Sequence, residues 1–175
     1  PVLMTGLRVA VERGDLEVHS QPIVIASTGM LAKAEALVRW RHPELGLMLP
    51  AQFLGIAEES QLIVSIGEWV LRSACEQAAR WQRSGHEGFR IAVNVSSHQF
   101  QSGHFVAMVR DALRDAGLRP DSLELEITER SLLSGGQRTL AQFAMLRGLG
   151  VRMAIDDFGT GYSALAYLKQ LPVDV

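Results

Sequence analysis

The chain has 175 residues, of which 47% are hydrophobic and 21% charged, and its formal net charge is -2 at pH 7. This composition predicts one folded domain of ordinary size and excludes a disordered chain. The near-neutral charge gives no basis for broad electrostatic binding to a nucleic acid polymer or an anionic membrane. No apolar run approaches the roughly 20 residues of a membrane-spanning helix, and the first residues lack a signal-peptide pattern.

The hydrophobic pattern predicts strands and helices that alternate from about residue 30 onward. The expected strands are residues 16–26, 31–40, 89–95, 122–128 and 151–155, with a sixth beginning in the final LPVDV. The expected helices are residues 50–59, 63–83, 105–116, 137–149 and 163–170. Pro50 suits the first turn of a helix, and Gly117 and Gly150 are typical of positions that end one.

This alternation is typical of parallel βα units, and both an open doubly wound sheet and a (β/α)₈ barrel fit it. No glycine-rich phosphate loop follows the first strand, which counts against a dinucleotide-binding fold. We therefore predict an α/β protein with a TIM-like (β/α)₈ barrel. Because 175 residues fall short of the roughly 250 typical of such a barrel, we expect the barrel to be truncated after about five to six strands.

Oxygen-bearing side chains recur near the ends of four consecutive predicted strands, namely Glu35, Asn94, Glu126, Asp156 and Asp157. Converging carboxylate oxygens with one amide oxygen suit hard cations such as Mg²⁺, Mn²⁺ or Ca²⁺. A bound cation would also remove the repulsion between the adjacent Asp156 and Asp157. Each residue taken alone has a plainer interpretation as a solvated strand end or a helix cap. Their repetition over four strands predicts a cation site instead.

Three further residues have two interpretations each. Arg39 follows Glu35 on the same predicted strand and could bind phosphate in a bidentate way, or could form a surface ion pair with Glu44. Gln21 could present its amide to a ligand or simply line a polar surface. Cys75, the single cysteine, lies in a helical run and is expected to be a core side chain, which suits a reducing cytosol.

Several motifs together carry a family resemblance: EALVRW from Glu35, NVS from Asn94, ELEITE from Glu124 and DDFGTGYSAL from Asp156. QPIV, RHPELG, WVLRSAC and the final LPVDV match as well. In this order, over nearly the whole chain, they resemble the EAL-domain family of cyclic di-GMP phosphodiesterases. The resemblance implies that residues 1–175 are a partial EAL domain that lacks the C-terminal strands and helices.

The resemblance also implies a two-metal hydrolase that opens cyclic di-GMP to linear pGpG with Mg²⁺ or Mn²⁺. It assigns Glu35, Asn94, Glu126 and Asp156 as metal ligands and Asp157 to the second metal or its bound water. Glu35, Asp156 and Asp157 are thereby the expected catalytic residues.

Further implied roles concern the substrate and the surroundings of the site. Gln21 and Arg39 would contact the dinucleotide, and Glu129 would stabilise the loop over residues 157–163, which family members use in ligand response and dimer contacts. A homodimer, attached sensory or cyclase domains, and a location in the cytoplasm or on the cytosolic face of a membrane-tethered parent all agree with this assignment.

Later family motifs fall beyond Val175: a Lys-x-Asp motif, a catalytic glutamate in an EGVE-like motif, and a glutamine that contacts guanine. Three hypotheses therefore stay open. The complete domain is a phosphodiesterase, or it is a receptor that holds cyclic di-GMP without cutting it, or the chain is an inactive fragment. We expect the 175-residue chain alone to have little or no hydrolase activity.

Overall fold

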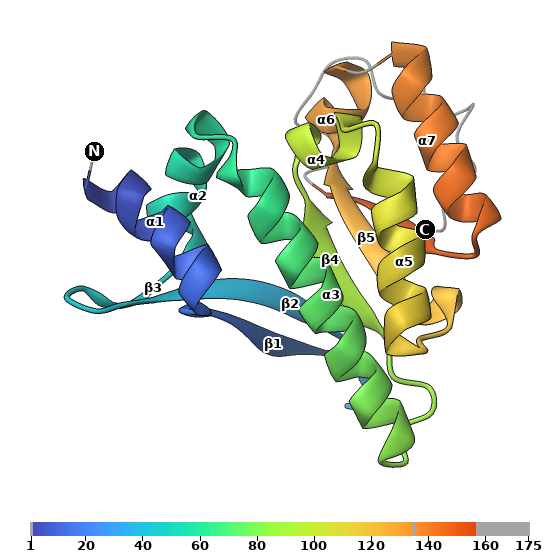
Figure 1. Ribbon diagram of the computed structural model, residues 1–175. Coiled ribbons are helices and arrows are strands. Elements are labelled where there is room, and N and C mark those ends of the chain that lie inside the picture. The colour runs from blue at the N-terminus through green and yellow to red at the C-terminus, as the bar shows by residue number, and fades with distance from the viewer. Residues whose placement is uncertain (1, 135, 157–175) are drawn as a thin grey trace.

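The computed structural model describes residues 2–134 and 136–156, which form one six-stranded sheet with helices against one of its faces (Figure 1). The strands are β1 Leu16–Val24, β2 Leu31–His42, β3 Gly46–Met48, β4 Ile91–Val95, β5 Leu123–Thr128 and β6 Arg152–Asp156. The helices are α1 Val2–Arg13, α2 Pro50–Glu59, α3 Leu62–Arg83, α4 Ser97–Gln101, α5 Phe105–Ala116, α6 Glu129–Ser134 and α7 Gly136–Gly148, with a 3-10 turn η1 at Pro120–Ser122.

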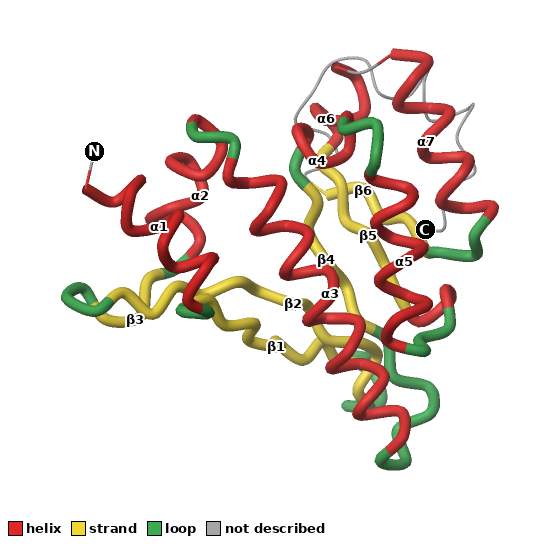
Figure 2. Tube along the Cα trace, viewed as in Figure 1, coloured by secondary structure: helices red, strands yellow, loops and turns green. Residues whose placement is uncertain are grey.

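The strand order is β1-β2-β4-β5-β6, with β3 paired to the far end of β2. Strands β2, β4, β5 and β6 are parallel to one another, whereas β1 and β3 run antiparallel to β2. Helix α3 connects the β2–β3 hairpin to β4, and α5 and α7 lie in the next two connections. Figure 2 shows these three helices on the same side of the strands. The predicted βα units are therefore present.

The core lies between the sheet and these helices. Helix α3 buries residues at helical spacing, among them Ile63, Ile66, Val70 and Ala74, because its apolar stripe faces the strands. Cys75 is fully buried in the same stripe, as expected for a core side chain. Burial raises the pKa of the Cys75 thiol to about 12, and the nearby Glu76 carboxylate adds to the rise.

The sequence pattern predicted most ends of helices and strands to within two residues of those observed. Pro50 is the first residue of α2, and α5 ends at Gly117, whose φ of 67° is the left-handed conformation that glycine adopts without strain. The expected helix over residues 163–170 and the expected sixth strand lie outside the described residues. Among the helices of the described part, none is both long and apolar enough to cross a membrane.

Sequence reasoning missed five short or terminal elements, namely α1, β3, α4, η1 and α6. Helix α1 buries Leu7 and Ala10, and its Gly6 lies beside the ring of Trp40. Strand β3 pairs with Trp40, Arg41 and His42, so β2 continues to His42 rather than ending at residue 40. These elements depend on tertiary contacts, which a short local pattern does not specify.

Candidate functional site on the uncovered face of the sheet

Strand alternation separates an apolar face from a polar face. On β5, Leu123, Leu125 and Ile127 are fully buried under the helices, whereas Glu124 and Glu126 are half-buried on the opposite face. Strand β2 follows the same pattern, with its buried residues and its half-buried polar residues at alternate positions. Side chains two residues apart in a strand share one face. The polar positions of neighbouring strands therefore meet on the face that the helices do not cover.

Register brings Glu35, Asn94 and Glu126 together on this face. The Asn94 side-chain amide donates a hydrogen bond of 2.6 Å to Oε1 of Glu35, and Asn94 pairs in register with Glu126 on the next strand. Glu35 is not at the end of its strand, as the sequence suggested, but at the fifth of twelve positions in β2. It still reaches the site because β4 pairs with β2 only over Ala34–Ala36. Glu35 is the middle residue of this short paired stretch and so lies next to β4.

The predicted substrate residues flank this group on β2 and β1. Gln21 is the direct register partner of Glu35 in the antiparallel β1–β2 pair, so the two side chains share a face. Arg39 lies four residues beyond Glu35, opposite Glu17, and its Nη1 donates to the carbonyl of Val38 at 2.9 Å. The alternative surface ion pair with Glu44 is not among the ion pairs of the described residues.

A lysine that sequence reasoning passed over completes the polar face. Lys33 forms ion pairs with Glu124 and, at 3.0 Å from Nζ to Oε1, with Glu126. Burial opposes the charge of Lys33, but its hydrogen bonds to both glutamates outweigh that effect and raise its pKa overall. The sequence did show that Lys33 lies two residues before Glu35, which puts both side chains on the same face of the strand. Nothing in the local pattern showed that Lys33 reaches across to β5.

The surroundings of Glu126 shift the pKa of its carboxyl. Burial raises the pKa of its carboxyl, the Lys33 hydrogen bond works in the opposite direction, and repulsion from Glu35 and Glu124 adds to the rise. A nearby positive charge offsets such repulsion between carboxylates. The local environment of Glu126 therefore favours a nearby cation.

Asp156 lies on the same face, one step further along the strands. It pairs in register with Thr128, two residues beyond Ala154, which is the partner of Glu126. Two strand residues correspond to a displacement of about 7 Å. Asp156 is exposed at the end of β6, whereas Asp157 lies outside the described residues.

Glu129 opens α6 and is 4% exposed. Its burial fits a structural role, while the loop over residues 157–163 that it is predicted to stabilise lies outside the described residues. The assignment of Glu129 to that loop stays a prediction.

The donor chemistry fits a hard divalent cation. Two carboxylates, Glu35 and Glu126, meet one amide, Asn94, and oxygen donors of this kind are those that Mg²⁺ and Mn²⁺ prefer. No three His, Cys, Asp or Glu side chains within residues 2–134 and 136–156 come together as a metal-binding group. The side chains that come together are thus two carboxylates and one amide. Asp156 lies two strand residues further along the sheet.

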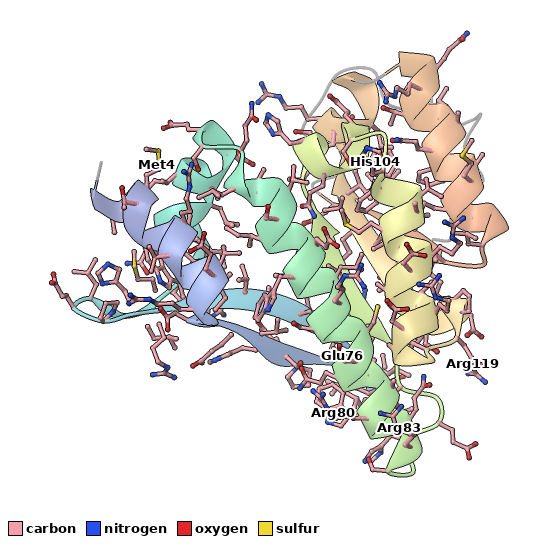
Figure 3. All side chains as sticks on the ribbon, in the orientation of Figure 1. Met4, Glu76, Arg80, Arg83, His104 and Arg119 are labelled. Atoms are coloured by element: carbon pink, nitrogen blue, oxygen red, sulfur yellow. The ribbon has the colours of Figure 1, made fainter. Side chains whose placement is uncertain are left out.

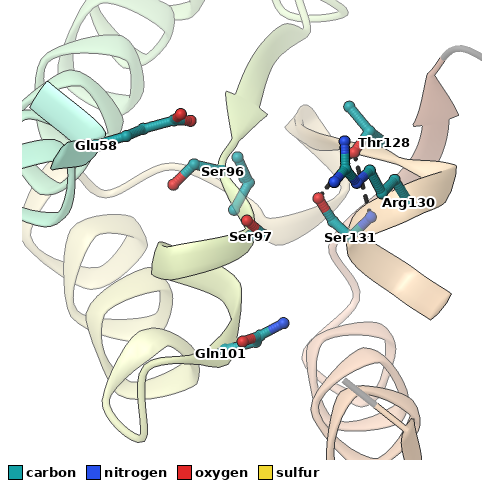
Figure 4. A pocket seen from close by; sticks show the side chains of 8 residues that line it. Glu58, Ser96, Ser97, Gln101, Thr128, Arg130 and Ser131 are labelled. Atoms are coloured by element: carbon teal, nitrogen blue, oxygen red, sulfur yellow. Dashed lines mark hydrogen bonds between the residues drawn. The ribbon is translucent and has the colours of Figure 1, made fainter. Parts of the chain in front are cut away.

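A polar cavity of about 590 Å³ adjoins this region at the carboxyl ends of β4 and β5. Figure 4 shows Glu58 of α2 on one side, Arg130 and Ser131 of α6 on the other, and Ser96 and Ser97 between them. A second, mostly apolar cavity of about 320 Å³ shares part of this lining and also includes Asn94 and Glu126. Ligand sites in parallel α/β folds lie at this end of the strands.

The fold and the site together define the class: a parallel α/β barrel segment whose uncovered face carries acids and amides. The EAL domain family model matches residues 5–175, and the chain belongs to the EAL domain family. The bifunctional diguanylate cyclase/cyclic di-GMP phosphodiesterase MucR of Pseudomonas aeruginosa is 48% identical over 170 residues, which are 97% of this chain and 25% of MucR. The cyclic di-GMP phosphodiesterase NbdA of the same organism is 46% identical over 168 residues, or 96% of this chain and 22% of NbdA.

Solved structures agree with this assignment. The PaMucR phosphodiesterase in complex with c-di-GMP superposes with a TM-score of 0.95 at 46% identity, over 99% of this chain and 70% of that one. The EAL enzyme Bd1971 in its cAMP- and cyclic-di-GMP-bound form gives 0.89 at 31% identity, over 99% of this chain and 48% of that one. These neighbours are TIM-barrel-like EAL domains, which confirms the predicted fold class. The chain spans about a quarter of the length of the curated relatives named above.

Proposed function

We propose that the complete domain to which this chain belongs hydrolyses cyclic di-GMP to linear pGpG, and that residues 1–175 supply the N-terminal part of its barrel. The observation that carries the proposal is the row of Gln21, Glu35, Asn94 and Glu126 across four adjacent strands of one face. The names of the relatives MucR and NbdA, both cyclic di-GMP phosphodiesterases, support the same activity.

Two Mg²⁺ or Mn²⁺ ions would be held by Glu35, Asn94, Glu126 and Asp156, with Asp157 serving the second ion or its water. When bound, such ions activate water as a nucleophile and stabilise the charge that develops on phosphate. The role of the chain itself is to preset the donors: β4 holds Asn94 against Glu35, and β5 places Glu126 beside both.

The dinucleotide would lie over the same face. Gln21, opposite Glu35, would orient it through the side-chain amide, and the Arg39 guanidinium would bind a phosphate oxygen pair. Glu129 would support the loop that follows Asp157. We further propose a cytosolic site of action, additional sensory or cyclase domains in the parent protein, and a homodimer.

The test is the Mn²⁺-dependent conversion of cyclic di-GMP to pGpG by the full-length protein, with Glu35→Ala as the site variant. We expect Glu35→Ala to abolish turnover, whereas Glu87→Ala, which removes an exposed carboxylate from the loop between α3 and β4, should leave it unchanged. A near-normal rate for Glu35→Ala would make Glu35 only structural.

The same assay separates the other two hypotheses. Tight binding of cyclic di-GMP by the full-length protein without pGpG formation would favour the receptor. The 175-residue chain by itself should show little or no turnover, and robust turnover would contradict our assignment of essential residues to the rest of the barrel.

A further inference from the structure

Lys33 is placed where a cation would be expected to bind. Its ammonium group contacts both Glu124 and Glu126, which project from β5 to the same side two residues apart. The side chains of Lys33, Glu124 and Glu126 are 19%, 12% and 15% exposed, so the three charges are largely shielded from water. The Coulomb attraction between charges shielded in this way is stronger than between charges on the surface.

The contact spans an intervening strand. Lys33 lies on β2 and its partners lie on β5, while β4 runs between them. On β4 the residue level with Glu35 and Glu124 is Ala92, which is 0% exposed although it lies on the face without helices. Its small methyl group leaves room for the Lys33 side chain, which crosses β4 to reach Glu124 and Glu126. The ion pair is therefore built into the packing of three strands.

Carboxylates outnumber the cation that contacts them in this layer. Lys33 contacts two carboxylates, Glu124 and Glu126. Arg90, just before β4, donates its Nη2 to the carbonyl of Ala32 at 3.5 Å. Arg152, the register partner of Glu124 on β6, donates its Nε to the carbonyl of Asp121 at 3.3 Å instead. Of the cationic side chains in the described residues, Lys33 is the one placed in contact with Glu126.

We propose that Lys33 is a built-in counter-ion, which neutralises and orients Glu126 when no metal is bound and thereby lowers the affinity of the site for a divalent cation. The inference rests on the proposed metal role of Glu126. Lys33 acts through Glu126 and is a positioning residue, not a catalytic one. A divalent cation that reaches Glu126 must share or displace the Lys33 contact, and it meets the repulsion of the ammonium charge at close range.

The measurement is the dissociation constant of Mn²⁺ for the full-length protein, obtained from the electron paramagnetic resonance signal of free Mn²⁺. Lys33→Met keeps the length of the side chain and removes its charge, and we expect Mn²⁺ binding to tighten by about tenfold or more. The melting temperature in metal-free buffer should fall, because Glu124 and Glu126 then repel each other without compensation.

Three control variants make the test specific. Arg83→Met also removes one positive charge, but from the exposed end of α3 (Figure 3), and should leave Mn²⁺ binding unchanged. Lys33→Arg retains the charge and should keep the affinity within about twofold of the original. The double variant Lys33→Met with Glu124→Gln removes one charge of each sign and should return the affinity towards the starting value.

The outcomes are separable from those of the proposed function. Unchanged or weaker Mn²⁺ binding by Lys33→Met would overturn the counter-ion role while leaving the phosphodiesterase assignment intact. Tighter binding without hydrolysis by the original protein would support the counter-ion role and contradict the phosphodiesterase. If neither the original protein nor Lys33→Met binds Mn²⁺, both proposals are wrong.

Discussion

The two faces of β5 show how one strand serves stability and function at once. Leu123, Leu125 and Ile127 are fully buried against helices, where their contribution depends on shape and apolar area. Glu124 and Glu126 are one residue away from them along the chain, yet both form hydrogen bonds with Lys33 on the opposite face. The apolar face therefore holds the strands in register. This register in turn fixes the distances between the acidic side chains on the other face.

The largest effect is expected from a cavity on the apolar face. Leu125→Ala should lower the free energy of unfolding by about 3 kcal/mol, because a fully buried leucine is replaced by a void. Urea denaturation of the full-length protein measures this loss. Leu45→Ala, at a position that is 60% exposed, should cost less than about 0.5 kcal/mol. Equal losses at both positions would contradict the division between the two faces.

The reciprocal change on the polar face should affect activity much more than stability. Glu126→Gln removes a proposed metal ligand, and we expect turnover of cyclic di-GMP to fall at least 100-fold, since even indirect partners of metal ligands contribute about 10–100-fold. The free energy of unfolding in metal-free buffer should change by less than about 1 kcal/mol, because the loss of the Lys33 contact is offset by relief of the repulsion from Glu35 and Glu124. Steady-state kinetics and urea denaturation of the same sample measure the two effects. If the lost activity were accompanied by a large loss of unfolding free energy, the role of Glu126 would be structural.

A smaller effect is expected where α3 approaches the turn that follows β4. A methyl group on Gly67 would lie 1.7 Å from Nε2 of Gln99, and the Gln99 and Ser96 side chains cap α4 reciprocally. Gly67→Ala should therefore destabilise the protein by about 1–2 kcal/mol through loss of this cap. Thermal or urea unfolding measures the change.

The matched control for Gly67→Ala is another helical glycine. Gly55 in α2 has no atom within 4 Å of an added methyl group, so Gly55→Ala should be neutral or stabilise the helix by about 0.5–1 kcal/mol. If both variants behaved alike, close packing of Gln99 against α3 would not be what requires glycine at position 67.

The last effect is absent at neutral pH and concerns only the alkaline limb of stability. The pKa of Cys75 is about 12 in the folded protein against 9.0 for a free thiol, so the unfolded chain loses this proton first. The free energy of unfolding should then fall by up to about 1.4 kcal/mol per pH unit between pH 9 and 12, and this contribution should be constant below pH 9. The difference between the original protein and Cys75→Ala isolates it, because other groups titrate equally in both. A difference that did not vary with pH would show that the thiol is not shielded.

Sequence alone determined the alternation of strands and helices, the period of two that turns Glu35, Glu126 and Asp156 away from the helices, and the family motifs. These features are local, because they depend on the spacing of a few residues along one element. That is why α3, α5 and the parallel strands agree with expectation to within two residues, and why the EAL assignment came from motif order.

Only the tertiary structure decided which polar residues meet. It placed Gln21 opposite Glu35, brought Asn94 within 2.6 Å of Glu35, and carried Lys33 over Ala92 to Glu126. It also set Asp156 one step beyond the other donors. Such pairings depend on strand order and register, which result from packing between separate strands up to 93 residues apart, and no local pattern in the chain specifies them.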